Sequence, residues 1–444
     1  MEDKEPERNG VMNQVFTCRR NEVEHYFRLF PDIPREAILK EDILRLGVRF
    51  TEAALQHGKS GRPRSYYIFS YDRTPIDKME HQESLRAPDE VMLTGGPYEL
   101  RRTLVSTRVN NDSSYVIDVA DGALVLREDD EILADVEFPP VPRYYAKAFP
   151  DGTQYSETMP VIGWGHRAFS TLLRACGHWG KNLECKFCDL NANARALKKT
   201  GRSYTMRKKV EHVAEVAAEV FLNQPEDEPR RVCLRMSGGT ILDRDKGAEG
   251  DEEFYLDYVR AIRDRIGGRW PIILQTAAKD KATCRKMRDA GVTAHESNIE
   301  VWDPNLFKVL CPGKERIVGR DRWISMVIDS VDVFGEGNVS PGLVAGVELA
   351  QPYGFKDVVD AVKSTAEGLD YLMSHGVVPR IPVWCVEPLS ALADNAPPPL
   401  EYFIRIDQIW YETWKKYRLP APCGYQMGPG RSVYQNTASL DLGS

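Results

Sequence analysis

Residues 176–188 read CGHWGKNLECKFC, in which Cys176, Cys185 and Cys188 are separated by eight and then two residues, and Phe187 stands directly before the last cysteine. Three thiolates on one short loop can ligate three irons of a [4Fe-4S] cluster, whose usual complement is four cysteines. The fourth iron then has no protein ligand and is open to another molecule. The spacing therefore predicts a catalytic iron–sulfur site at these three cysteines.

Two other interpretations of the same cysteines stay open. A structural zinc site usually takes four Cys or His ligands with paired spacing. His178 could be the fourth ligand, but it lies inside the wide gap and has no paired partner. A single nucleophilic cysteine does not need three clustered thiols. A zinc-stabilised binding scaffold is the non-enzyme alternative.

The composition is typical of a large intracellular protein. The chain has 444 residues, 42% hydrophobic and 28% charged, enough for a sizeable core and more than one domain. Nine scattered cysteines and the lack of an apolar signal segment indicate a reducing, cytoplasmic location. No long apolar stretch predicts a membrane span. The net charge of −7 gives no overall attraction for nucleic acid and disfavours it as a partner.

The first 150 residues predict a separate α+β domain. Residues 1–22 are charged and poor in apolar side chains, which is typical of a mobile terminus. Apolar residues recur at helical spacing over 23–60. Short β-branched or alternating runs at 104–108, 115–119, 123–127 and 132–138 are separated by turn residues and indicate an antiparallel meander. We expect an N-terminal α+β domain over 23–150.

Strands and helices alternate beyond the cysteine loop. Strands are expected at 232–236, 271–276, 292–301, 339–347 and 377–386, with helices at 207–221, 254–266, 281–290, 323–334 and 358–375. Each parallel crossover needs a helix-sized connection, so this order predicts a parallel sheet with helices outside. We expect a partial (β/α)6 TIM-like barrel over 151–395. The C-terminal segment, 396–444, is expected to comprise a helix at 400–417 and a tail.

Three further motifs follow the cysteine loop at predicted strand ends. They are Ser237-Gly238-Gly239-Thr240, Asn298-Ile299-Glu300, and the segment from Gly342 through Gly346 to Glu348. Together with the loop, they resemble the radical S-adenosylmethionine (SAM) superfamily, whose members carry three cysteines after the first barrel strand and an aromatic before the third. The first gap of eight departs from the commonest gap of three, although longer gaps occur, as in the Elongator catalytic subunit. The resemblance covers about residues 160–395.

The resemblance implies a role for each motif. Cys176, Cys185 and Cys188 would hold the cluster, and Phe187 and Ser237 belong to the cofactor-binding motifs. Gly238 and Gly239 would bind the methionine amine of SAM through exposed backbone, because a Cβ would hold the ligand away. Asn298 and Glu300 would hydrogen-bond the ribose hydroxyls, and apolar side chains near Gly346 would pack on adenine.

The resemblance also implies an activity. Electron transfer from the reduced cluster would cleave SAM to a 5′-deoxyadenosyl radical, which abstracts hydrogen from a small-molecule biosynthetic substrate. Such a radical must be shielded from water, and the cluster needs a flavodoxin or ferredoxin as electron donor. The alternative within the same superfamily is methylation, sulfur insertion, or modification of RNA or a peptide, and the first 150 residues are then a candidate for substrate choice.

Substrate-facing residues are expected at the carboxyl ends of the strands, where loops face the cofactor in such sheets. Cys311, in the run Leu-Cys-Pro-Gly-Lys, is a candidate radical-quenching or methylatable thiol. The full set of candidate substrate-side residues is Gln275, His295, Glu296, Cys311, Cys385 and Glu387.

Overall fold

A computed structural model of the chain describes residues 19–57, 73–74, 87–180, 182–199, 205–242 and 251–425. Most of the predicted mobile terminus and of the predicted tail therefore lies outside the described residues. Helix α1 (Arg19–Leu29) begins inside the range 1–22 that we expect to be a terminus, four residues before the predicted start of the N-terminal domain at residue 23.

The N-terminal region forms a six-stranded sheet with helices α1, α2 (Arg35–Leu46) and α3 (Glu52–His57). The strand order is β1-β4-β5-β6-β2-β3, and every pair is antiparallel except β1 with β4. The strands are β1 (Arg49–Phe50), β2 (Glu90–Gly95), β3 (Leu100–Ser106), β4 (Tyr115–Ala120), β5 (Ala123–Glu128) and β6 (Glu131–Glu137).

Strand β2 was not among the predicted strands, and its position changes the predicted order of the sheet. It lies between β6 and β3, so the sheet is not a simple meander. Its first four residues, Glu90 to Leu93, are all buried, and so its sequence does not alternate between apolar and polar residues. A strand buried on both faces lacks the period-2 signal on which the prediction depends.

The second sheet is parallel and open. Strands β8 (Arg167–Leu173), β9 (Cys233–Gly238), β10 (Ile272–Gln275) and β11 (Ala294–Glu296) pair in parallel, and β7 (Val161–Ile162) is an antiparallel edge. Isolated parallel bridges join His295 to Val339 and Gly342 to Arg380. Four strands and two bridged segments thus give six parallel positions. Among the described residues, no pairing closes the two edges into a barrel.

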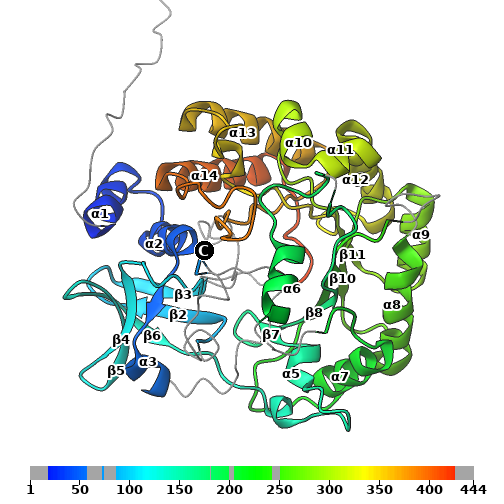
Figure 1. Ribbon diagram of the computed structural model, residues 1–444, viewed down its shortest axis with the longest axis horizontal. Coiled ribbons are helices and arrows are strands. Elements are labelled where there is room, and N and C mark those ends of the chain that lie inside the picture. The colour runs from blue at the N-terminus through cyan, green and yellow to red at the C-terminus, as the bar shows by residue number, and fades with distance from the viewer. Residues whose placement is uncertain are drawn as a thin grey trace, which may run out of the picture.

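Helices form an arc around the parallel sheet, and the N-terminal sheet lies at its open side (Figure 1). The helices of this part are α5 (Tyr155–Thr158), α6 (Leu190–Lys199), α7 (Val210–Leu222), α8 (Glu252–Ile266), α9 (Lys281–Asp289), α10 (Pro304–Leu310), α11 (Pro312–Ile317), α12 (Arg320–Phe334), α13 (Val358–Ser374) and α14 (Leu400–Tyr417). Helices α7, α8, α9, α12, α13 and α14 coincide with predicted helices to within a few residues. Cys311, directly before Pro312, separates the short helices α10 and α11.

The strand register places four polar side chains in one row across the sheet. Thr171 is opposite Ser237, Ser237 is opposite Gln275, and Gln275 is opposite Glu296. Each stands at or near the carboxyl end of its strand. Alternate residues of a strand point to the same face, so Arg235 lies on the same face as Ser237 but deeper in the sheet.

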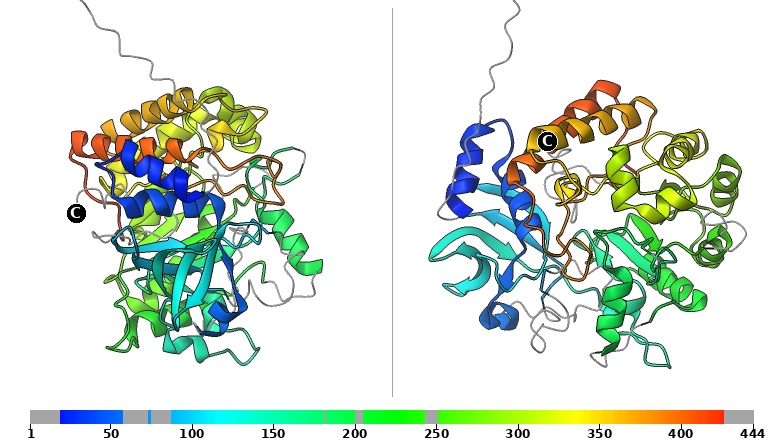
Figure 2. Two further views of the ribbon diagram at one scale, coloured as in Figure 1. Left: turned by 90° about the vertical axis from the view of Figure 1, so that its left-hand side faces the viewer. Right: turned by 45° about the horizontal axis from the view of Figure 1, so that its top comes forward.

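The two regions share one hydrophobic core. Buried residues from Val23 on α1 to Leu419 after α14 belong to a single cluster. Two arginines of the N-terminal region also donate hydrogen bonds to backbone carbonyls of the C-terminal region. Arg45 Nη1 donates to Pro398 O at 3.1 Å, and Arg108 Nη2 donates to Val383 O at 2.8 Å. Figure 2 shows α1 and α2 beside α14. The N-terminal region is therefore packed onto the parallel sheet and its helices, not tethered to them.

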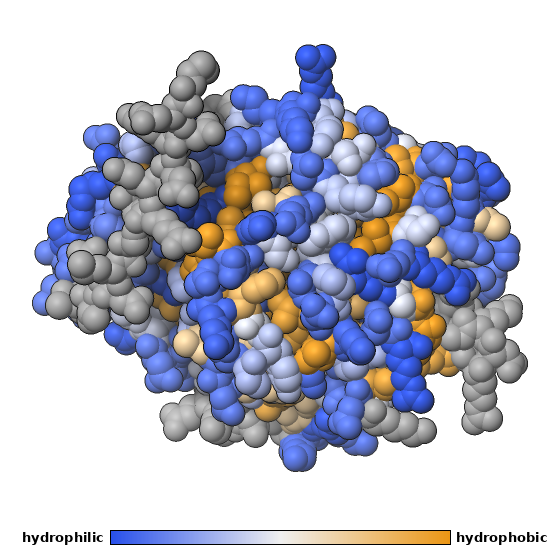
Figure 3. Space-filling view, turned by 90° about the horizontal axis from the view of Figure 1, so that it is seen from above, coloured by the Kyte–Doolittle hydropathy of each residue, from blue (hydrophilic) through white to orange (hydrophobic). Residues whose placement is uncertain are grey.

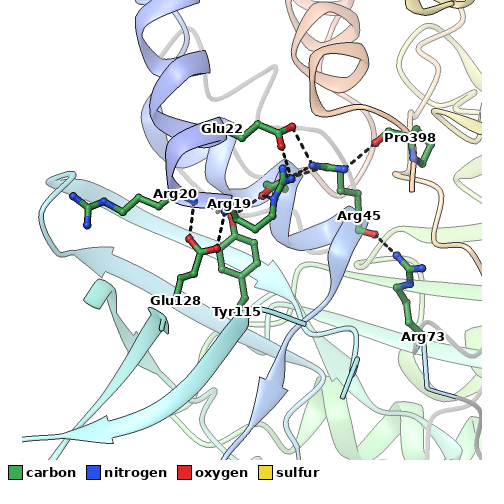
Figure 4. A network of polar contacts seen from close by, with 9 residues as sticks. Arg19, Arg20, Glu22, Arg45, Arg73, Tyr115, Glu128 and Pro398 are labelled. Carbon is green, nitrogen blue, oxygen red and sulfur yellow. Dashed lines mark hydrogen bonds and ion pairs between the residues drawn. The ribbon is translucent and has the colours of Figure 1, made fainter. Parts of the chain in front are cut away.

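A buried polar network fixes α1 and α2 on the N-terminal sheet (Figure 4). The Asp42 carboxylate accepts hydrogen bonds from Arg19 Nη2 at 3.2 Å, Arg45 Nε at 2.7 Å and Tyr115 Oη at 2.6 Å. Glu128 on β5 accepts the backbone N–H groups of Arg19 and Arg20, which are orphan donors at the start of α1.

In the described part of the chain, none of the helices is both long and apolar enough to cross a membrane. The face seen from above, over α13 and α14, is mostly hydrophilic with apolar side chains in the furrows (Figure 3).

Candidate active site

A large cavity opens where the parallel strands end. The cavity has a volume of about 230 Å³. The structure brings twelve of the predicted residues together in its lining: Cys176, Cys185, Phe187, Cys188, Ser237, Gly238, Gly239, Gln275, Asn298, Glu300, Cys385 and Glu387.

The cysteine loop is held by hydrogen bonds to its neighbours. The Asn191 side chain accepts from Cys176 N–H at 2.9 Å and donates to Cys176 O at 3.0 Å. The Gly177 N–H donates to Thr240 O at 2.7 Å and Lys186 N–H to Leu310 O at 2.8 Å. The loop therefore follows β8 directly and is tied to the segment after β9 and to the end of α10.

Burial raises the pKa of the Cys176 thiol, and burial together with Glu387 raises the pKa of Cys188 well above its usual range. Without a ligand, these thiols stay protonated. A bound metal centre reverses this preference because coordination deprotonates a thiol. Three thiols at one cavity wall are the donor set that an iron–sulfur cluster requires.

A further observation fits a missing group. The His178 side chain is 3% exposed, lines the same cavity, and has no hydrogen-bond partner at either ring nitrogen. Burial and nearby Lys314 lower its pKa to about 4. Within the described residues, no group of three or more His, Cys, Asp or Glu side chains is placed to hold a metal ion.

The glycine pair serves the cysteine loop as well as the cavity. A Cβ on Gly239 would overlap the carbonyl oxygen of Ala175 and lie 2.7 Å from Cys176 Cα. A Cβ on Gly238 would lie 2.5 Å from Tyr255 Oη. We expect glycine at this strand end because it leaves space for a ligand. This reason is incomplete, because the backbone that carries Cys176 already occupies the space that a Cβ on Gly239 would need.

Asn298 and Glu300 follow β11 and are fixed by other side chains. Asn298 Oδ1 accepts from Gly342 N–H and from Arg380 Nη2, both at 3.0 Å. Glu300 has a φ of 77° and pairs with Lys314 Nζ at 2.6 Å. Burial lowers the pKa of Lys314, but Glu300 and two cysteines outweigh it and raise the pKa to about 12, so Lys314 stays charged. It also lies 4.5 Å from the centre of the Trp323 ring.

Deeper in the cavity, two arginines converge on one carboxylate. Arg235 Nη2 lies 2.5 Å and Arg380 Nη2 lies 3.2 Å from Glu296 Oε2. Arg235 Nη2 also donates to Gln275 Oε1 at 3.2 Å. Both arginines and Gln275 line the cavity, whereas Glu296 is not part of its lining.

Four predicted site residues lie outside the cavity lining. Gly346 has a φ of 96° and a Cβ there would meet Pro398, so it is a turn glycine. Glu296 pairs with the two arginines. His295 is held between Thr276 and Ser297, and Cys311 is fully buried beside Cys185. Each is surrounded by protein atoms and supports the site from behind.

Sequence reasoning missed several residues that line the cavity. Arg235 and Arg380 are charged residues inside predicted strands, and a charged residue in a strand of a parallel sheet is a usable signal. Lys314 stands three residues after Cys311, outside the predicted motifs. Arg108 comes from the N-terminal region, and no sequence motif links it to the cysteine loop. The missed lining residues include Arg108, Thr171, Arg235, Lys314, Trp323, Arg380 and Trp384.

The fold is an open parallel α/β sheet that carries three cysteines and a glycine pair at its carboxyl edge. No family model matches the chain. A bacteriochlorophyllide c C-7(1)-hydroxylase of Chlorobaculum limnaeum is 25% identical over 148 residues, 33% of this chain and 34% of that protein. The match thus spans about a third of the length of this curated relative.

Similar solved structures include a methylornithine synthase (TM-score 0.40, 15% identity, covering 56% of this chain and 62% of that chain). A maturase of the [FeFe]-hydrogenase has a TM-score of 0.38 and 14% identity, and the match covers 55% of this chain and 50% of that chain. A radical SAM methyltransferase from Sphaerobacter thermophilus has a TM-score of 0.38 and 14% identity, and the match covers 69% of this chain and 74% of that chain. The last of these three structures is a radical SAM enzyme, of the superfamily that the sequence motifs resemble.

Proposed function

We propose that this protein is a radical SAM enzyme that abstracts hydrogen from a small molecule. The observation that carries the proposal is the convergence, in one cavity, of three cysteines from one loop with the glycine pair after β9 and the Asn298–Glu300 segment after β11. When bound, the reduced cluster and SAM supply a carbon-centred radical that can take hydrogen from an unactivated C–H bond.

The residues of this chain divide the work by position. Cys176, Cys185 and Cys188 would hold the cluster. The backbone after β9 and the pair of Glu300 with Lys314 line the adjoining space, where SAM would bind. The N-terminal region contributes Arg108 to the opposite lining and packs over the open side of the sheet, which supports a role in excluding water from the reactive centre.

The charges deep in the cavity support a substrate with an anionic group. Arg235 and Arg380 both pair with Glu296 and both line the cavity, so a carboxylate or phosphate of the substrate would meet two guanidinium groups there. The size of the cavity supports a metabolite rather than a folded macromolecule. An external one-electron donor of the flavodoxin or ferredoxin type would reduce the cluster.

Anaerobic reconstitution tests the cluster. The wild-type protein is expected to bind about four irons and four sulfides per chain. Changing Cys176, Cys185 and Cys188 together to Ala should abolish this uptake, whereas Cys284→Ala, at a buried cysteine of α9 outside the cavity lining, should leave it unchanged. One tight zinc per chain without iron uptake would contradict the proposal and favour the binding scaffold.

Product analysis tests the chemistry. Reduction with dithionite in the presence of SAM should give 5′-deoxyadenosine and methionine, slowly even without substrate. The rate of 5′-deoxyadenosine formation should rise with a metabolite fraction that binds to an anion-exchange resin. Stimulation by a nucleic-acid or peptide fraction instead would favour the alternative reaction class.

A further inference from the structure

His178 is a buried polar side chain without a partner, at the wall where the three cysteines meet. It is 3% exposed, and neither Nδ1 nor Nε2 has a hydrogen-bond partner. An imidazole carries an N–H on at least one nitrogen in every protonation state, so one donor is always present. Buried donors in folded proteins are almost always paired, because an unpaired one costs about 1–3 kcal/mol.

The surroundings of His178 limit where its partner can be. The backbone of α11 closes one side, since a Cβ on Gly313 would lie 2.6 Å from Nδ1. Gly313 N–H is itself bonded to Leu183 O at 3.0 Å, so this contact is fixed. The side chain otherwise faces the cavity that Cys176, Cys185 and Cys188 also line. The missing acceptor therefore belongs to whatever fills this part of the cavity.

Resting on the proposed function, we infer that the His178 imidazole donates a hydrogen bond to a sulfur of the iron–sulfur cluster and is a positioning residue that sets its reduction potential. His178 is not counted as an iron ligand, because the proposed function leaves the fourth iron open for SAM. Hydrogen bonds to cluster sulfurs stabilise negative charge, and the reduced cluster carries more of it. The hydrogen bond therefore raises the potential and makes the cluster easier to reduce.

The matched variants are His178→Phe, which keeps a ring of similar size but removes the N–H, and His178→Gln, which keeps a donor. His375→Phe, at an exposed histidine after α13, is the control. We expect the Phe variant to bind the same iron as wild type but to show a more negative midpoint potential in an anaerobic redox titration. The Gln variant should move back toward wild type, and the control should not change.

Electron–nuclear double resonance on the reduced wild-type cluster gives a second, independent measurement. We expect an exchangeable proton coupling that disappears in D₂O and in His178→Phe. If the Phe variant does not fold, this wild-type signal with ¹⁵N-labelled histidine still decides the question, since a weak ¹⁵N coupling supports a hydrogen bond. A strong coupling would show an iron–nitrogen bond and overturn the inference.

The inference and the proposed function fail in different ways. A wild-type protein that takes up no iron overturns both. A cluster that forms normally but has the same potential and the same exchangeable-proton signal in wild type and His178→Phe overturns the inference alone.

Discussion

Gly239 couples the SAM-binding strand end to the cysteine loop at the level of a single residue. Changing Gly239 to Ala places a Cβ against the backbone of Ala175 and Cys176, which cannot move without moving the loop. We expect iron content and SAM binding to fall together, with a stability loss of about 1–3 kcal/mol. Iron analysis and equilibrium binding of SAM measure the two effects.

Gly268 provides the control for this substitution. A Cβ there meets nothing within 4 Å, and the backbone needs no positive φ. Gly268→Ala should therefore keep both iron and SAM binding. If Gly239→Ala loses SAM binding but keeps full iron content, the glycine serves the ligand alone and does not support the cysteine loop.

The residues predicted from sequence are those that lie in local motifs. The three cysteines, the glycine pair and Asn298 with Glu300 are each recognisable within a few positions, and the structure places all of them at one cavity. Lys314, Arg235 and Arg380 reach the same cavity from separate elements. Their importance depends on pairing across the sheet, and no local spacing records such long-range pairs.

At the scale of elements, the Asp42 network predicts a defined pH dependence of stability. Desolvation raises the pKa of Asp42, but Arg45, Arg19 and the Tyr115 hydroxyl outweigh it and hold the pKa below its usual range. A carboxylate with a lowered pKa in the folded state adds stability above its unfolded pKa of about 3.9. This contribution is lost as the pH falls through the lower folded-state value.

Changing Asp42 to Asn should therefore destabilise the N-terminal region at neutral pH by about 3 kcal/mol, because two arginines lose a buried partner. Urea unfolding at several pH values measures the difference from wild type. The difference should shrink below about pH 3.9. Asp130→Asn, at an exposed turn, should have no effect. A constant difference across this range would show that the charge of Asp42 contributes nothing.

Elements with strong periodicity are predictable, and short buried strands are not. Helices α7, α8, α13 and α14 have apolar faces of several turns, so the 3.6-residue pattern fixes them. Strand β11 has only three residues, and the two segments after it pair through isolated bridges. The sequence predicts extended chain at these places, but their ends depend on the loops that carry the site.

At the scale of the whole molecule, the N-terminal region is a wall of the site and part of the common core. Arg108 bonds Val383 O and Leu44 O and lines the cavity. Helix α2 packs on α14, and Arg45 bonds Pro398 O. The sequence predicts a detachable module because the two regions differ in their strand and helix patterns. Packing between regions leaves no such pattern, so the shared core was not predictable.

The last prediction follows from this shared core. A truncated variant that begins at Pro142 would expose the apolar faces of α14 and the open side of the parallel sheet, which α1, α2 and the first sheet now cover. We expect it to aggregate or to lose cooperative thermal unfolding, because exposed apolar patches of this size promote association. Size-exclusion chromatography and a thermal melt measure this against the full chain, with deletion of residues 1–18 as the control. A monodisperse truncated protein that melts at the full-length temperature and cleaves SAM would show that the N-terminal region is a separable module after all.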